Sequence, residues 1–128
     1  MEDPYVVEIE REVRLWLANL SPRDYLNVED IVERLVDSPT TLGEPYSRHL
    51  GGAVRELRFD LGNDRDAIRI PYWLAPGRRI ILLTVFRKSK LRESSEVARA
   101  KRAQATCAAQ HEPAHEEYTR IFNKEQLR

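Results

Sequence analysis

The spacing of apolar positions changes along the chain, and each change marks a different kind of element. From about Glu8 to Asn19 apolar residues recur every three or four positions, which predicts a helix. A second helix is predicted from Ser21-Pro22 to near Ser38-Pro39, because Ser21 suits the N-cap and Pro22 the first helical position. The short connection predicts an antiparallel helical hairpin. Residues 5–7 fit either a short edge strand or the start of the first helix.

From residue 54 the period becomes two, which predicts strands. The segments VRELRFDL (54–61) and AIRIPYWL (67–74) alternate in this way, and a third strand is predicted from Arg79 to Arg87. Pro71 has no N–H for the sheet, so we expect an edge position or a bulge there. Residues 39–52 are predicted to form a connecting loop, because Gly and Pro recur in them.

A third helix is predicted from Ser94 or Ser95 to about Ala109, and a final short helix from Ala114 to Lys124. The order indicates an α+β fold, in which an N-terminal helical hairpin and a C-terminal helix cover one face of a small antiparallel sheet of three or four strands. The other face is predicted to stay open. With 128 residues we expect one domain over residues 1–107, followed by a helical tail over residues 108–128.

Charge is unevenly distributed, although the formal net charge is zero. Residues 1–54 carry 5 Arg and 11 Asp or Glu, whereas residues 55–102 carry 13 Lys or Arg and 6 Asp or Glu. This polarity suggests that one face of the protein binds a polyanion and that the acidic residues lie on a face turned away from it. The alternative is that the charges only solvate helix faces and form ion pairs across the fold. With a single cysteine, no signal-like N-terminus and no long apolar run, we expect a cytoplasmic protein with no membrane contact.

Cations gather where the first two predicted strands lie side by side and where the third ends. Arg58 and Arg69 fall on the polar phase of their strands and are expected next to each other on the open face. Four further cations follow the apolar run that ends at Phe86: Arg87, Lys88, Lys90 and Arg92. Arginine grips phosphate bidentately and stays protonated at neutral pH. The pattern therefore predicts a rigid patch for a nucleic-acid backbone.

Other residues extend this hypothesis, each with a simpler alternative. Tyr72 and Trp73 either offer a base-stacking surface or belong to the core. Arg58 either binds phosphate or pairs with Glu56 or Asp60. The predicted RNA-binding set beyond the central cations comprises Arg55, Lys90, Arg92, Arg79, Trp73 and His49.

Four strings in this order resemble the RelE/HigB-type toxins of bacterial toxin–antitoxin modules. They are RELRF (55–59), AIRIPYW (67–73), RRIILLTVFRKSK (78–90) and SSEVARAKRA (94–103), preceded by the loop LGEPYSRHL. The resemblance covers about residues 5–105. Ile68 stands where the family usually has a tyrosine, and Pro71 lies in the middle of a strand.

The resemblance implies a ribosome-dependent endoribonuclease that cleaves mRNA and inhibits translation, with no cofactor. It also implies an antitoxin partner encoded nearby, of the HigA-like type with a helix-turn-helix domain. Carried over by position, the catalytic residues are Arg69, Arg87, Lys88, Arg58 and Tyr72. Two alternatives stay open: a ParE-type inhibitor of DNA gyrase, and a nucleic-acid-binding module without catalysis.

The expected reaction is attack of the ribose 2′-hydroxyl on the adjacent phosphorus, and cations can stabilise the charge that develops. A general base is not obvious. His49, Glu56, Lys88 and Lys90 are the candidates, and the alternative for His49 is a local loop contact. Cys107, His111 and His115 are spaced like ligands on one helix, but Pro113 breaks that helix, so we expect no metal site.

Overall fold

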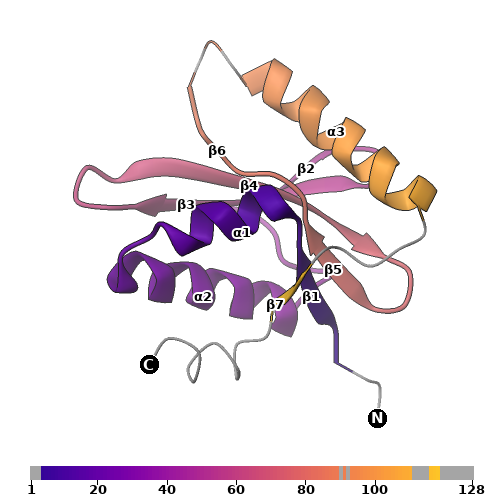
Figure 1. Cartoon of the computed structure of the whole chain (residues 1–128), viewed down its shortest axis with the longest axis horizontal. Coiled ribbons are helices and arrows are strands. Elements are labelled where there is room, and N and C mark those ends of the chain that lie inside the picture. The colour runs from indigo at the N-terminus through magenta and orange to yellow at the C-terminus, as the bar shows by residue number, and fades with distance from the viewer. Residues whose placement is uncertain (1–3, 90, 92, 111–115, 119–128) are drawn as a thin grey trace.

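A mixed β-sheet forms the centre of the molecule (Figure 1). The computed structural model describes residues 4–89, 91 and 93–110, and the backbone of 116–118. In this part of the chain the strands are β1 (Val6–Ile9), β2 (Ser47–Gly51), β3 (Val54–Leu61), β4 (Asp66–Ala75), β5 (Arg79–Leu82), β6 (Phe86–Arg87) and β7 (Glu116–Tyr118). The helices are α1 (Arg11–Ala18), α2 (Pro22–Asp37) and α3 (Glu93–Gln110). The α+β class and the order of its main elements are as predicted.

The sheet is larger than the predicted meander, because three further strands, β1, β2 and β7, join it from segments without a clear strand pattern. Its order is β2-β3-β4-β5-β1-β7, and β6 also pairs with β4. Strand β1 runs parallel to β5 and lies between β5 and β7. The strand alternative for residues 5–7 is therefore confirmed, although β1 is not at an edge of the sheet. The first predicted helix is also confirmed, and it begins at Arg11 instead of Glu8. Val7 and Ile9 are both buried, as a strand's alternation requires.

Strand β2 was predicted as loop and instead pairs with β3 from Ser47 to Gly51. The hairpin turns at Gly51 and Gly52, whose φ angles of 116° and 57° favour glycine. A register shift after His49 shortens the pairing. Glu116–Tyr118, predicted to lie in a short helix, form β7, and the rest of that predicted helix lies outside the described residues. The boundary predicted after residue 107 falls inside α3.

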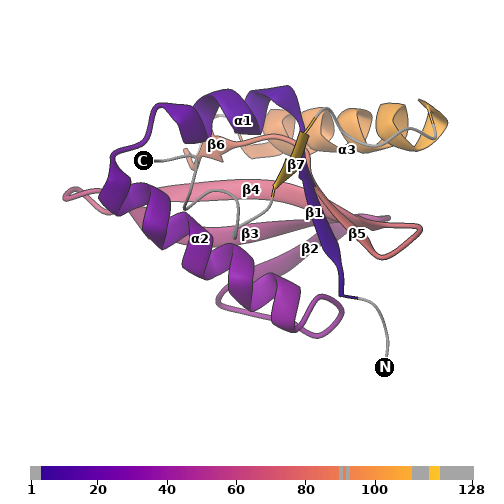
Figure 2. The ribbon, with the colours of Figure 1, turned by 60° about the horizontal axis from the view of Figure 1, so that its bottom comes forward.

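Both faces of the sheet are covered by helices, so the predicted open face is wrong. Side chains of α1 and α2 pack on one face around Leu57, Ile70 and Tyr72. Ala100 and Cys107 of α3 pack on the other face against Trp73 and Ile81. Figures 1 and 2 show α2 and α3 on opposite sides of β3 and β4. The cover from α3 lies toward the Trp73 end of β4, which leaves the Arg69 end of that face for the site described below.

Helix α2 begins as its sequence predicts. The Ser21 side chain accepts a hydrogen bond from the backbone N–H of Asp24 at 3.2 Å, which satisfies one of the free donors of the first turn. Pro22 occupies the first turn, and the helix ends at Asp37. Within the described residues no helix is long and apolar enough to cross a membrane.

The third predicted strand is interrupted opposite Pro71. Leu82 pairs with Tyr72 and Phe86 pairs with Arg69, so the segment between them has no regular partner in β4. The Pro71 carbonyl still accepts a hydrogen bond from the Leu83 N–H at 2.8 Å. Pro71 has no N–H of its own to offer on that side, which accounts for the break. Pro71 does not lie at an edge of the sheet, because β4 has strands on both sides, but the break opposite it is the irregularity that the alternative of a bulge predicted.

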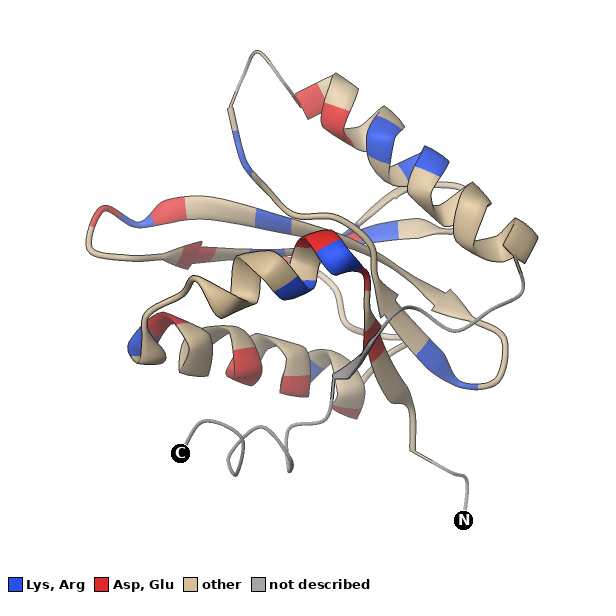
Figure 3. Ribbon diagram, viewed as in Figure 1, with Lys and Arg blue, Asp and Glu red and all other residues tan. Residues whose placement is uncertain are grey.

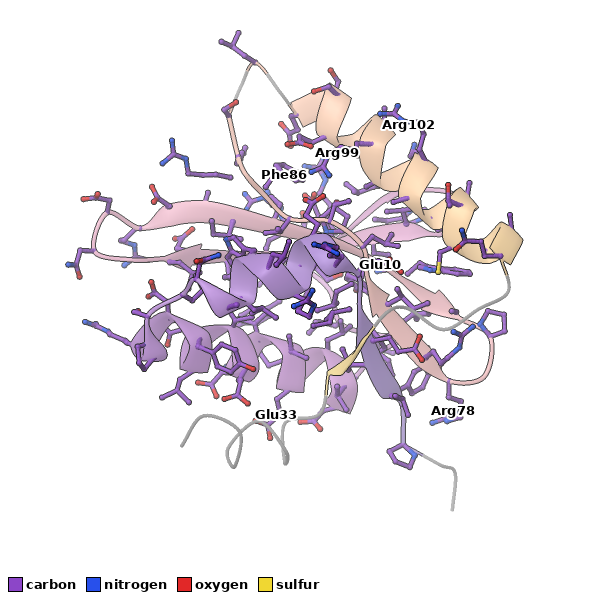
Figure 4. All side chains as sticks on the ribbon, in the orientation of Figure 1. Glu10, Glu33, Arg78, Phe86, Arg99 and Arg102 are labelled. Carbon is purple, nitrogen blue, oxygen red and sulfur yellow. The ribbon has the colours of Figure 1, made fainter. Side chains whose placement is uncertain are left out.

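Two side chains from opposite layers take over the hydrogen bonding at this break. The Val85 N–H donates to the Glu12 carboxylate of α1 at 2.9 Å, and Arg99 of α3 donates to the same carboxylate and to the Val85 carbonyl. The hydrogen bonds with Glu12 raise the pKa of Arg99 above its usual value. Figure 4 shows Arg99 on the side of α3 that faces Phe86 and α1. We call this arrangement the Glu12–Arg99 clamp.

Candidate functional site

Arg58 and Arg69 lie directly opposite each other on β3 and β4, as predicted. Directly paired residues of antiparallel strands point to the same face. Glu56, two residues before Arg58, shares that face. One oxygen of the Glu56 carboxylate lies 3.8 Å from the Nε atoms of both arginines. The two cations therefore share one buried carboxylate.

Burial dominates the electrostatics of this trio. Glu56 is 1% exposed and Arg69 is 7% exposed. Burial raises the pKa of Glu56, although the two arginines act in the opposite direction. Burial and the nearby charge of Arg58 lower the pKa of Arg69. Arg69 also donates to the Ile68 carbonyl at 3.0 Å, which fixes its side chain along the strand.

The raised pKa of Glu56 predicts a pH dependence of stability. The unfolded group titrates near 4.5, and the folded group titrates higher. The folded protein thus keeps the proton of Glu56 to higher pH than the unfolded chain does. The contribution of Glu56 to the free energy of unfolding is therefore full below pH 4.5 and declines as pH rises through the folded pKa. We expect Glu56→Gln to remove that decline when urea unfolding is measured from pH 4 to pH 8. Asp64→Asn removes one carboxylate from an exposed turn and controls for net charge. If the two variants show the same dependence of unfolding free energy on pH, Glu56 is not the group responsible.

Two more cations lie on the same face, one on the neighbouring strand β2 and one directly after β6. Arg48 of β2 pairs in register with Glu56. Lys88 follows β6, and its N–H donates to the Ala67 carbonyl, which returns its side chain to the face of Arg69. Arg48 and Lys88 are exposed. We call Arg48, Arg58, Arg69 and Lys88 the cationic face. Figure 3 shows how cations recur along the strands of the sheet.

Arg48 was missed because its segment was predicted as loop. Strand β2 has only five residues, and such a short segment does not indicate a strand when glycine or proline residues lie on both sides of it. Arg87, by contrast, was predicted for this site but pairs with Ile68, on the opposite face. It is exposed and forms an ion pair with Asp66 at 3.6 Å.

Three other predicted site residues lie on the face that packs against α1 and α2. Tyr72 is fully buried there, and its hydroxyl lies 2.7 Å from that of Ser47. Arg55 donates to Ser47 and to the Leu42 carbonyl. His49 pairs in register with Arg55, and its Nε2 lies 2.8 Å from the Gly52 carbonyl oxygen. The structure does not bring Tyr72, Arg55 or His49 to the cationic face.

The position of Tyr72 predicts a packing role. We expect Tyr72→Phe to lower the free energy of unfolding by about 1 kcal/mol, because the hydroxyl loses its buried partner on Ser47. Thermal unfolding and growth arrest on expression are the two measurements. If the variant no longer arrests growth although its melting temperature is unchanged, Tyr72 has a catalytic role instead of a packing role.

The remaining predicted residues are separate from the cationic face or outside the described residues. Trp73 is buried in the cluster beneath α3. Arg79, at the start of β5, pairs with Glu8 at 3.2 Å. Lys90, Arg92, His111 and His115 lie outside the described residues. Among the residues that the structure describes, no three His, Cys, Asp or Glu side chains gather as a metal site would require.

A groove of about 680 Å³ adjoins the arginine pair. It runs along the edge of β3 beyond its pairing with β2, and α2 forms its other wall. Arg58 and Arg69 line it from the sheet, Arg34 from α2 and Tyr46 from the segment before β2. The guanidinium of Arg34 lies 4.6 Å from the centre of the Tyr46 ring.

Comparison with known proteins places the chain in a family. Residues 15–108 match the model of the family described as Phage derived protein Gp49-like (DUF891). No curated protein matches the chain. Among solved structures, a double arginine-to-alanine mutant of E. coli toxin RelE in the free state matches with a TM-score of 0.53 and 14% identity, covering 77% of this chain and 94% of that one. The predicted RelE-type resemblance is confirmed in family and fold: the chain belongs to the Gp49-like family and has the RelE fold.

Proposed function

We propose that this protein is the toxin of a toxin–antitoxin module and a ribosome-dependent endoribonuclease that cleaves mRNA. The observation that carries the proposal is the direct pairing of Arg58 with Arg69 on a face that also holds Lys88. Two arginines on adjacent strands, with a lysine directly after β6 on the same face, suit one phosphodiester group. The family and the RelE fold support the same class of protein.

The cationic face can stabilise the reaction that RNA cleavage requires. When the 2′-hydroxyl attacks the neighbouring phosphorus, negative charge builds on the phosphorane oxygens and on the leaving 5′-oxygen. Arg58 and Arg69 supply fixed donors for the first, and the exposed amine of Lys88 is placed to serve the second or to exchange the proton. The ribosome contributes by holding the mRNA in line for attack.

The other candidate bases fit this role less well. Glu56 is buried under the arginines and has no route to a substrate hydroxyl. His49 faces the opposite side of β2. The catalytic group that we propose is therefore Arg58, Arg69 and Lys88, with Arg48 binding the RNA backbone beside them.

We also propose that a cognate antitoxin, of the HigA-like type with a helix-turn-helix domain, holds the toxin inactive in the cytoplasm. Helix α2 carries several acidic residues, coloured red in Figure 3, and offers one surface for such a partner, and the cationic face offers another.

The decisive test is to induce the chain alone in cells and map mRNA 5′ ends. Cuts at positions fixed relative to the reading frame support the nuclease. DNA breaks without RNA cuts would favour a gyrase inhibitor of the ParE type. Growth arrest with neither lesion would indicate nucleic-acid binding without catalysis.

A further inference from the structure

The groove beside β3 has features that the phosphate chemistry of the cationic face does not use. Strand β2 pairs with β3 only as far as Leu57, and the next contact is the Arg58 N–H donating to the Tyr46 carbonyl at 2.9 Å. Beyond it, Phe59 and Asp60 line the groove together with Asn27, Asp30 and Ile31 of α2. An aromatic and aliphatic lining thus alternates with amide and carboxylate groups.

The Arg34–Tyr46 pair is the chemically distinctive part of this lining. A guanidinium held 4.6 Å from a ring centre presents a flat, cationic surface. RNA bases that leave the helical stack are held on such aromatic and guanidinium planes. Tyr46 is half-buried and Arg34 is exposed, so the pair is reachable from the groove.

We propose that this groove is a nucleoside subsite, which holds the base and ribose attached to the phosphate bound by Arg58 and Arg69. The inference rests on the proposed function and adds where the substrate's nucleoside lies. Phosphate binds at the sheet end of the groove, and the base stacks on the Arg34–Tyr46 pair. Asn27 and Asp30 line the same groove and offer amide and carboxylate groups to the hydrogen-bonding edge of a base.

Size and charge both suit one nucleotide. A volume of about 680 Å³ lies within the range of roughly 300–1,000 Å³ typical of small-molecule sites. The lining carries four arginines and two aspartates, and the pairing of Asp60 with Arg65 at 3.5 Å uses one charge of each sign. Arg58 also pairs with Glu44 at 3.4 Å and shares the Glu56 carboxylate with Arg69, so the phosphate of a nucleotide would bind here in exchange for these carboxylate contacts.

The first test measures binding of a fluorescein-labelled RNA tetranucleotide whose 2′-O-methyl sugars prevent cleavage. Tyr46→Leu keeps apolar bulk but removes the ring, whereas Tyr46→Phe keeps the ring. We expect Tyr46→Leu to weaken binding by about five-fold or more, and Tyr46→Phe to bind like the natural protein. An abasic tetranucleotide should bind both variants equally, because it has no base to stack.

Two results would overturn the subsite: equal RNA affinity for Tyr46→Leu and the natural protein, or the same loss for the abasic probe. The second test maps mRNA cuts on ribosomes. Tyr46→Leu is expected to change which nucleotide is preferred at the cut, whereas Arg11→Ala, at the exposed start of α1, is not. An unchanged preference would also reject the subsite. Absence of cuts by the natural protein would instead reject the nuclease, so the two failures are distinguishable.

Discussion

Arg69→Ala is expected to abolish growth arrest on expression and to lower ribosome-dependent mRNA cleavage by about 100-fold or more. Removing one preorganised donor to a developing anion typically costs this much. The Arg69 side chain is fixed in place, because it donates a hydrogen bond to the Ile68 carbonyl and shares the Glu56 carboxylate with Arg58. We therefore expect no neighbouring cation to take over its role. In the variant, Arg58 is left facing the buried carboxylate alone.

The variant should remain folded, since it also removes the like-charge contact between Arg58 and Arg69. Circular dichroism and thermal unfolding check this point. Arg69→Lys keeps the charge without the planar fork and is expected to retain intermediate cleavage. Arg11→Ala removes one exposed arginine elsewhere and controls for net charge. Cleavage by Arg69→Ala at the natural rate would show that the proposed site is wrong.

Arg99→Met is expected to lower the free energy of unfolding by about 1–2 kcal/mol, measured by urea unfolding at neutral pH. Charge-assisted hydrogen bonds contribute more than neutral ones, but about a third of each side chain is exposed, so solvent screens the pair. The raised pKa of Arg99 keeps it protonated across the neutral range, so this loss should not vary with pH there.

The Glu12–Arg99 clamp makes a sharper prediction through a double-mutant cycle. Glu12→Ala should cost more than Glu12→Gln, because the Val85 N–H loses its acceptor in the first and keeps one in the second. Glu12→Ala combined with Arg99→Met should cost less than the sum of the single changes. Strict additivity would mean that the two side chains do not act together.

The elements with strong periodicity were predictable, and those with short or mixed patterns were not. Helix α2 carries a cap, a proline and a continuous apolar stripe, and its bounds followed directly. Strands β3 and β4 alternate over eight and ten residues. Strands β1 and β2 have only four and five residues, so the pattern of the neighbouring helix or turn outweighed theirs.

The site was predictable to the extent that it depends on strand phase. The phases of Arg58 and Arg69 in their strands predicted that both side chains share one face, where they pair. Tyr72 lies three positions from Arg69 in the same strand, and an odd separation places it on the opposite face. Arg87 was misplaced because register across the break at Pro71 cannot be counted from the sequence. The groove could not be predicted, because it depends on the distance between α2 and the free edge of β3, and no local sequence pattern encodes that distance.

The parallel pairing of β1 with β5 has a consequence for how the chain folds. The hairpin of β3 and β4, which sets Arg58 beside Arg69, joins neighbouring parts of the chain and can form from local contacts. The β1–β5 contact joins Val6 to Arg79, and closing so long a loop is slow. The arginine pair can thus assemble before the sheet is complete. We therefore expect the pairing of β1 with β5 to be a late step of folding, after the arginine pair has formed.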